Sequence, residues 1–260
     1  MISVVINTYN AEKHLARVLD AVKGFDELLV CDMQSTDATI AIAETFGCKV
    51  LTFPRGENNI VEPARQFAIE QAANDWVLVV DADEIVTPAL HDYLYQLVAS
   101  PNPPDGLYIP RKNYFMGRFM HCHYPDYILR FFRKSVTNWP PVIHTQPHVE
   151  GHVERISRER MDLAFEHLAN DTISERIAKT NTYTDNELLK KQDKRYGWGA
   201  LIYRPFHRFF KAYVLKGGFR DGVPGFIKAC LEGYYQFVML AKFFEAQSTV
   251  QQHLETGSAK

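Results

Sequence analysis

Short apolar runs alternate with amphipathic segments along the first eighty residues of the chain. The runs have the composition of buried strands and occupy residues 2–6, 28–31, 50–53 and 76–80. Between them, apolar residues recur at helical spacing, which predicts helices over about residues 11–23, 38–46 and 62–73. Because strands and helices alternate with short links, we expect an α/β fold with a mostly parallel, doubly wound sheet.

The remainder of the chain has a less regular pattern. Thr87-Pro88 predicts the start of a further helix, and the proline-rich residues 101–104 interrupt the chain. Later elements are expected as strands at 107–109 and 127–132 and as helices at 174–191, 205–215 and 224–244. We therefore expect an α/β domain over residues 1–193, a helical appendage over 194–246 and a disordered tail over 247–260.

Polar and charged clusters follow the predicted strands. They are Thr8-Tyr9-Asn10, Asp32 with Ser35 and Asp37, Arg65 before the fourth strand, and Asp81-Ala82-Asp83. Ligands of open α/β sheets bind outside the carboxyl ends of the strands, so one crevice should collect these side chains. A carboxylate can accept a bond from a nucleobase or ribose, and Asp83 suits Mg²⁺ or Mn²⁺ bridging a diphosphate, whose charge Arg65 could offset.

These motifs resemble family 2 glycosyltransferases of the GT-A fold in both order and spacing. The resemblance continues through residues 111–117 and 124–133, which are similar to the branch containing lipopolysaccharide-core β-glucosyltransferases. That branch also ends in a Gly-Phe-x-Asp-Gly segment, here Gly218-Phe219-Arg220-Asp221-Gly222. The resemblance thus covers nearly all of residues 1–245, with a donor half over about 1–110 and an acceptor half over about 111–193.

The resemblance implies a nucleotide-sugar donor, most simply a UDP-sugar, and a glycan or glycolipid acceptor. It places the donor against Thr8, Tyr9, Asn10, Asp32, Arg65 and Asp81. Asp32 would bond the uracil or other base, and Asp83 would be the direct ligand of Mg²⁺ or Mn²⁺ under the diphosphate. Members of the family typically invert the anomeric centre in a single displacement, which requires a base for the acceptor hydroxyl.

The general base is not fixed by the resemblance, because the Glu-Asp pair that many relatives use is absent from the expected region. Asp126 is the first candidate and Glu150 the second. Ile143-His144-Thr145-Gln146 stands where the branch often has Val-His-Glu, so an acid is missing and His144 is a candidate for the metal or the phosphates.

The charge distribution adds a second expectation. The formal net charge is −2, but residues 194–228 hold eight Lys or Arg and one Asp, which makes that segment +7 and the remainder −9. Aromatic residues interleave with these cations, so residues 194–246 could contact a membrane peripherally, pack on the core or form a homodimer. The acidic remainder argues against nucleic-acid binding.

Two further features bear on location. The four cysteines are scattered, and no signal peptide or apolar run of membrane-spanning length is recognisable. We therefore expect a cytoplasmic protein, or one on the cytoplasmic face of the inner membrane.

Two other functions stay open at this point. A nucleotidyltransferase also combines an α/β sheet, acids and Mg²⁺, although Thr8-Tyr9-Asn10-Ala11 lacks the glycines of its usual phosphate loop. A catalytically silent nucleotide-sugar-binding protein is conceivable because of the missing acid at Gln146.

Overall fold

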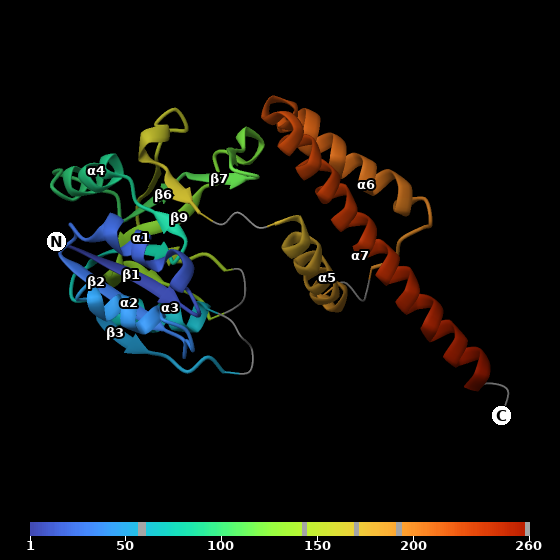
Figure 1. Ribbon diagram of the computed structural model, residues 1–260, viewed down its shortest axis with the longest axis horizontal. Helices are drawn as coiled ribbons and strands as arrows, with labels where there is room; N and C mark the ends of the chain where they lie inside the picture. The colour runs from blue at the N-terminus through green and yellow to red at the C-terminus, as the bar shows by residue number, and fades with distance from the viewer. Residues whose placement is uncertain (57–60, 142–144, 169–171, 191–193, 258–260) are drawn as a thin grey trace. The chain divides into compact units, whose positions relative to one another are not determined.

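The computed structural model describes residues 1–56, 61–141, 145–168, 172–190 and 194–257, with the side chains of 189–190 and 249–257 left out (Figure 1). The chain forms two compact units. The α/β unit consists of Met1–Asn113 and Tyr124–Ala169, and the helical unit consists of Tyr114–His123 and Asn170–Lys260. Helix α5 thus groups with the helical unit, whereas the sequence analysis drew the domain boundary at residue 193.

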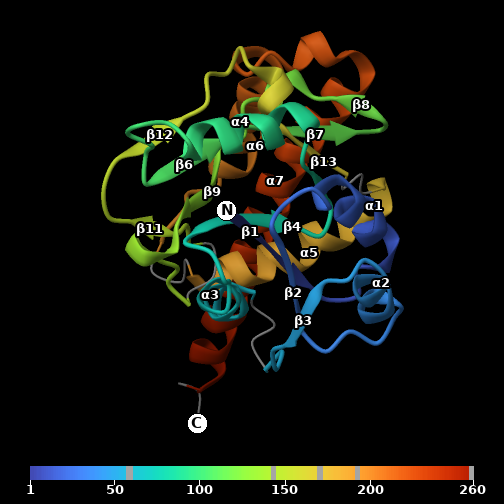
Figure 2. The same ribbon diagram turned by 90° about the vertical axis from the view of Figure 1, so that its left-hand side faces the viewer.

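A seven-stranded sheet forms the centre of the α/β unit, in the order β12-β6-β9-β4-β1-β2-β3 (Figure 2). Its strands are β1 Ile2–Thr8, β2 Glu27–Asp32, β3 Lys49–Thr52, β4 Trp76–Asp81, β6 Gly106–Ile109, β9 Ile128–Arg133 and β12 Val153–Arg155. Strands β1 to β4 are parallel, and β9 runs antiparallel between β4 and β6. The prediction of a mostly parallel sheet is confirmed.

Helices cover both faces of this sheet because successive strand residues point to opposite sides. Val4 and Ile6 of β1 pack in one buried cluster with α1 Glu12–Val22, α2 Thr39–Thr45 and α4 Pro88–Val98, and Val5 packs in a second cluster with α3 Glu62–Glu70. The inward face of α1 is fully buried, and each such side chain contributes about 1.5–3 kcal/mol.

A small second sheet lies at the carboxyl end of β4. Strand β5 Glu84–Ile85 pairs antiparallel with β13 Phe165–His167, and β13 pairs parallel with β7 Arg111–Phe115. This pairing sets His167 opposite Glu84 on one side and Asn113 on the other. A further short pair consists of β10 Thr137–Asn138 and β11 His148–Val149.

The helical unit contains α5 Ile173–Lys190, α6 Ala200–Phe210 and α7 Gly222–Gly257. A π-helical turn, Lys211–Leu215, and a 3₁₀ turn, Gly218–Asp221, join α6 to α7. The helix α7 continues to Gly257, although the sequence analysis expected a disordered tail from residue 247. None of the described helices combines the length and apolarity needed to cross a bilayer.

A hairpin in the helical unit consists of the end of β7, β8 Arg118–Phe119 and a 3₁₀ turn, His121–His123. The buried carboxylate of Asp221 holds this hairpin, because it accepts the backbone N–H groups of His121 and Cys122 at 2.9 and 3.1 Å. Gly225 is required beside it, since a Cβ there would lie 2.0 Å from the Gly218 carbonyl oxygen. The Gly-Phe-x-Asp-Gly segment therefore has a structural role in this unit.

Candidate active site

The carboxyl ends of β1 and β2 form a network around Asp32, whose side chain is fully buried. Its Oδ1 accepts the hydroxyls of Thr8 and Ser35 at 2.9 and 2.6 Å, and its Oδ2 accepts the Ser35 N–H at 2.8 Å. Asn10 has a left-handed backbone, accepts the Thr36 N–H at 2.8 Å and donates its own N–H to Ser35. A carboxylate has about four acceptor positions, so Oδ2 can still accept one further N–H.

Tyr9 lies beside this network and is 39% exposed. The guanidinium of Arg55 stacks on its ring, with 3.5 Å between the guanidinium carbon and the ring centroid. Sequence analysis did not select Arg55, because an arginine in an irregular segment carries no distinguishing pattern. The pair offers a flat, cationic surface at the rim of the site.

Asp81, at the end of β4, is clamped between two arginines. Its Oδ1 lies 2.6 Å from Arg65 Nη2, and its Oδ2 lies 2.7 Å from Arg130 Nη2. Both guanidinium groups stack near the ring of Trp139, at 5.0 and 5.4 Å. Asp81 thus positions two cations, and both of its oxygens are engaged.

Glu84 is also fully buried and is part of the same cluster. Its side chain accepts the Asp81 N–H at 3.1 Å and pairs with Arg111 Nη1 at 2.9 Å. Burial raises the pKa of Glu84, and the charge of Asp81 raises it further. Burial would also raise the pKa of Asp81, but Arg130 and Arg65 outweigh it and hold the Asp81 pKa at about 2. The sequence analysis gave Glu84 no role, whereas the structure shows it anchoring this cluster.

Asp126 belongs to the cluster through Arg111. Its Oδ2 accepts Arg111 Nε and Nη2 at 3.0 and 2.7 Å and Asn113 Nδ2 at 3.0 Å. Its side chain is 37% exposed. Glu150, the second candidate base, is exposed beyond β11, and its backbone N–H bonds Val136. Of the two candidates, Asp126 is the one that the described contacts join to Asp81.

Asp83 faces a histidine that sequence reasoning missed. His167 Nε2 lies 3.3 Å from Asp83 Oδ2, and the Leu168 N–H bonds the Asp83 carbonyl at 2.7 Å. On its other side, His167 Nδ1 lies 2.8 Å from Asn113 Oδ1. When Nδ1 donates to that oxygen, Nε2 directs its lone pair at Asp83. No sequence pattern points to His167, because β5 and β13 are too short to show periodicity.

Asp83 and His167 fit a divalent cation. Two ligands of one Mg²⁺ or Mn²⁺ lie about 3 Å apart when each bond is about 2.1 Å, and a metal-bound imidazole commonly donates its other N–H to a protein oxygen. The described residues contain no cluster of three or more such ligands, so diphosphate oxygens or water would complete the coordination. The other candidate ligand, His144, lies outside the described residues.

The fold and these motifs are those of an α/β enzyme whose acids lie at the carboxyl ends of parallel strands. Residues 3–145 match Glycosyl transferase family 2, and the chain belongs to this family. The resemblance found in the sequence is confirmed, and with it the GT-A type of fold and the glycosyltransferase class.

Relatives match over most of the chain. A glycosyltransferase of Rickettsia conorii is 28% identical over 94% of this chain and 90% of its own. The lipopolysaccharide core biosynthesis glycosyltransferase LpsC of Rhizobium meliloti is 27% identical, with 94% and 92% covered. Among solved structures, S. aureus TarS 1–349 in complex with UDP has 18% identity and a TM-score of 0.49, covering 98% of this chain and 91% of that one.

Proposed function

We propose that the protein transfers a sugar from a UDP-sugar to a hydroxyl of a glycan or glycolipid, with inversion at the anomeric carbon and with Mg²⁺ or Mn²⁺ bound at Asp83 and His167. The observation that carries the proposal is the 3.3 Å approach of His167 Nε2 to Asp83 Oδ2, beside the arginines that Asp81 holds. A pair of metal ligands next to two arginine side chains suits the binding of a diphosphate.

The donor is held by residues of β1, β2 and α3. Asp32 accepts the base N–H through the remaining position of Oδ2, and Thr8 and Asn10 fix the surrounding loop. The ring of Tyr9 and the guanidinium of Arg55 provide the flat surface for the base. Arg65, oriented by Asp81, offsets the charge of the diphosphate.

Transfer is a single displacement. The acceptor oxygen bonds to the anomeric carbon as the bond to the diphosphate oxygen breaks, and Asp126 takes the acceptor proton. When bound, the cation stabilises the negative charge that the leaving nucleoside diphosphate acquires. Oδ2 of Asp126 accepts three hydrogen bonds, from Arg111 Nε and Nη2 and from Asn113 Nδ2. Arg111 and Asn113 orient this carboxylate. We rank Glu150 second because it is exposed beyond β11.

The acceptor is proposed from the similarity to LpsC and from the helical unit. We assign the reaction to lipopolysaccharide core or another cell-envelope glycan, on the cytoplasmic face of the inner membrane. Residues 194–246 would contact that membrane peripherally, and a homodimer is the alternative use of the same surface. Membership of the glycosyltransferase family argues against the nucleotidyltransferase alternative.

The proposal is tested with a panel of nucleotide-sugars and Mn²⁺, by measuring thermal stabilisation and slow donor hydrolysis. We expect a UDP-sugar to stabilise the wild type and to be hydrolysed, and Asp83→Ala to lose both effects. The matched control is Asp92→Ala, which removes an exposed acid from α4. If no nucleotide-sugar stabilises the wild type, the proposal fails, and stabilisation without any turnover would favour a silent binding protein.

The base is tested separately with Asp126→Asn, which keeps the size and most hydrogen bonds of the side chain. We expect donor binding to be retained and transfer to fall by about 10²-fold or more, the range for losing a general base. Unchanged transfer would eliminate Asp126 and direct attention to Glu150.

A further inference from the structure

Helix α6 exposes its apolar side to solvent. Ile202, Phe206 and Phe210 follow one another at four-residue spacing and are 60%, 73% and 50% exposed, and Trp198 in the turn before the helix is 76% exposed. Residues four apart lie on the same side of a helix, so these side chains form one stripe. A helix of a soluble protein normally turns such a stripe inward.

The opposite side of α6 is already occupied by α7, which lies alongside it (Figure 1). Ala200 at the start of α6 is buried, and Arg208 pairs with Glu232 of α7 at 3.9 Å. A Cβ on Gly233 would lie 3.1 Å from the Pro205 carbonyl oxygen, so the two helices approach closely. The outward direction of the apolar stripe is therefore fixed by the packing of α6 within its own unit.

The exposed apolar surface continues through the turn into α7. Leu215, Phe219 and Val223 are 67%, 56% and 69% exposed. We call these three residues, together with Trp198, Ile202, Phe206 and Phe210, the apolar stripe. Contiguous exposed surface of this kind marks a contact with a membrane or a protein.

Cations distinguish between these partners. Lys211, Lys216 and Arg220 are exposed along the same turn, within the segment of residues 194–228 that carries +7. A second copy of the chain would present the same positive segment and repel it, whereas an anionic bilayer attracts it. Aromatic and aliphatic residues flanked by Lys and Arg are typical of helices that lie in the bilayer interface.

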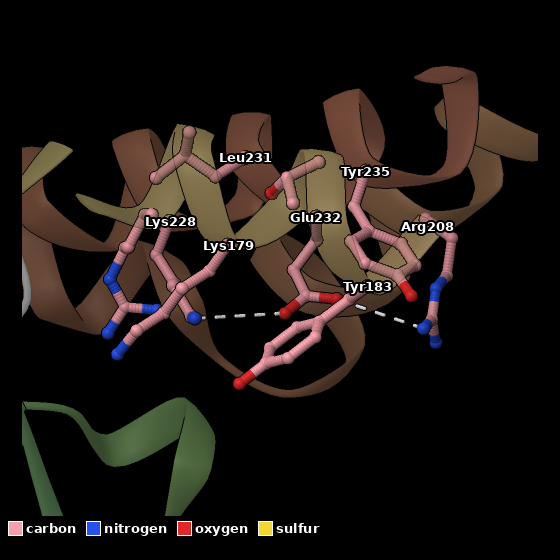
Figure 3. A pocket seen from close by; sticks show the side chains of 9 residues that line it. Lys179, Tyr183, Arg208, Lys228, Leu231, Glu232 and Tyr235 are labelled. Carbon is pink, nitrogen blue, oxygen red and sulfur yellow. Dashed lines mark ion pairs between the residues drawn. The ribbon is translucent and has the colours of Figure 1, made fainter. Parts of the chain in front are cut away.

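A cationic pocket in the same unit lies on the side of α6 that faces α7, away from the apolar stripe. It has a volume of about 310 Å³ and lies between α5, α6 and α7 (Figure 3). Four cations line it, Arg176, Lys179, Arg208 and Lys228, against the single acid Glu232. Glu232 is shared between Lys228 at 3.8 Å and Arg208 at 3.9 Å, so Arg208 is directed toward α7 and the pocket takes no part in the contact of the stripe.

We propose that the apolar stripe of α6 and the turn after it lies in the interface of an anionic phospholipid bilayer, whose phosphate groups are met by Lys211, Lys216 and Arg220. This inference deepens the proposed function, because it names the surface on which a glycolipid acceptor would be met. It does not depend on the donor chemistry, so vesicle binding and nucleotide-sugar turnover can fail independently.

Co-sedimentation of the full chain with vesicles tests the proposal. Wild-type protein should sediment with phosphatidylcholine vesicles that contain phosphatidylglycerol and much less with phosphatidylcholine alone, and high salt should reduce binding. The double variant Phe206→Ser/Phe210→Ser should partition onto the vesicles at least roughly tenfold more weakly. It removes two aromatic rings that insert into the bilayer interface when the wild type binds. Met161→Ser, which removes an exposed apolar side chain of the α/β unit, is the control and should bind like wild type.

Charge and stability measurements complete the test. Lys216→Glu/Arg220→Glu should abolish the preference for phosphatidylglycerol, whereas Lys179→Glu, in the pocket on the other side of α6, should bind like wild type. Melting temperature and donor hydrolysis in solution should be unchanged in the Phe206→Ser/Phe210→Ser variant, because an exposed stripe stabilises nothing in water. Equal vesicle binding by that variant would overturn the proposal. A wild-type dimer that dissociates in this variant would also overturn it, because the stripe would then contact a second copy of the chain. A marked loss of stability in this variant would overturn it as well, because the stripe would then be part of the internal packing.

Discussion

At the scale of single residues, the acids of the Asp81-Ala82-Asp83-Glu84 segment have three different environments. Asp81 is held between Arg65 and Arg130, Asp83 faces His167, and Glu84 is buried against Arg111. Asp81 is the last residue of β4 and Asp83 lies in the turn that follows, so both stand at the carboxyl end of the strand. The sequence could predict that these acids lie at a strand end. It placed Arg65 of α3 in the same site, but it could not predict the partners Arg111, Arg130 and His167, because they come from β7, β9 and β13.

The pairing of Glu84 with Arg111 yields a stability prediction. Arg111→Met leaves a fully buried carboxylate without its cation, which costs about 3–5 kcal/mol when one partner of a buried ion pair is removed. Denaturant unfolding should therefore show a large decrease in the free energy of unfolding. Arg158→Met, at an exposed position, should behave like wild type. Equal midpoints for the two variants would show that the Glu84 pair contributes little.

At the scale of elements, the pattern along the chain predicted the strands and helices of the α/β unit well, because long periodic segments carry strong signals. It placed the start of α6 at Pro205, yet α6 begins at Ala200. Proline usually marks a helix start, but here Pro205 lies inside the helix. Periodicity also cannot tell which way an apolar stripe faces, so the exposed side of α6 emerged only from the structure.

Asp221 gives a prediction at this scale. Asp221→Ala would leave the backbone N–H groups of His121 and Cys122 without their acceptor, and the buried N–H of Cys122 alone should cost about 1–3 kcal/mol. Amide hydrogen exchange at these two positions should accelerate, and the melting temperature should fall. Asp185→Ala breaks an exposed pair with Lys242 in the same unit and should have an effect below about 1 kcal/mol. Unchanged exchange at His121 would contradict the role of Asp221.

At the scale of the whole molecule, the mostly parallel sheet and the glycosyltransferase class could be predicted, whereas the smaller sheet could not. Strands of two or three residues have no periodic signal, and β5 pairs with β13 across about eighty residues of chain. His167 was missed for this reason. The grouping of α5 with the helical unit also depends on contacts that sequence spacing does not encode.

The lowered pKa of Asp81 predicts how the stability of the protein depends on pH in acid. A carboxyl whose folded pKa is about 2 stabilises the fold fully above its unfolded value near 4, and this contribution is lost as the pH falls toward 2. The pKa of Asp221 is also lowered: burial opposes the shift, and the hydrogen bonds from His121 and Cys122 outweigh burial. The melting temperature of the wild type should therefore fall as the pH is lowered below 4. The destabilisation caused by Asp81→Asn should be largest above pH 4 and shrink toward pH 2, whereas a constant difference would contradict this account.

The most direct test of the central claim is the affinity for Mn²⁺ in the presence of UDP, measured by electron paramagnetic resonance. We predict that wild type binds Mn²⁺ and that UDP strengthens this binding. Asp83→Ala and His167→Ala should each weaken the binding by at least about tenfold, while Asp92→Ala should not. If Asp83→Ala and His167→Ala bind Mn²⁺ and UDP as wild type does, the assignment of the metal site to Asp83 and His167 is wrong.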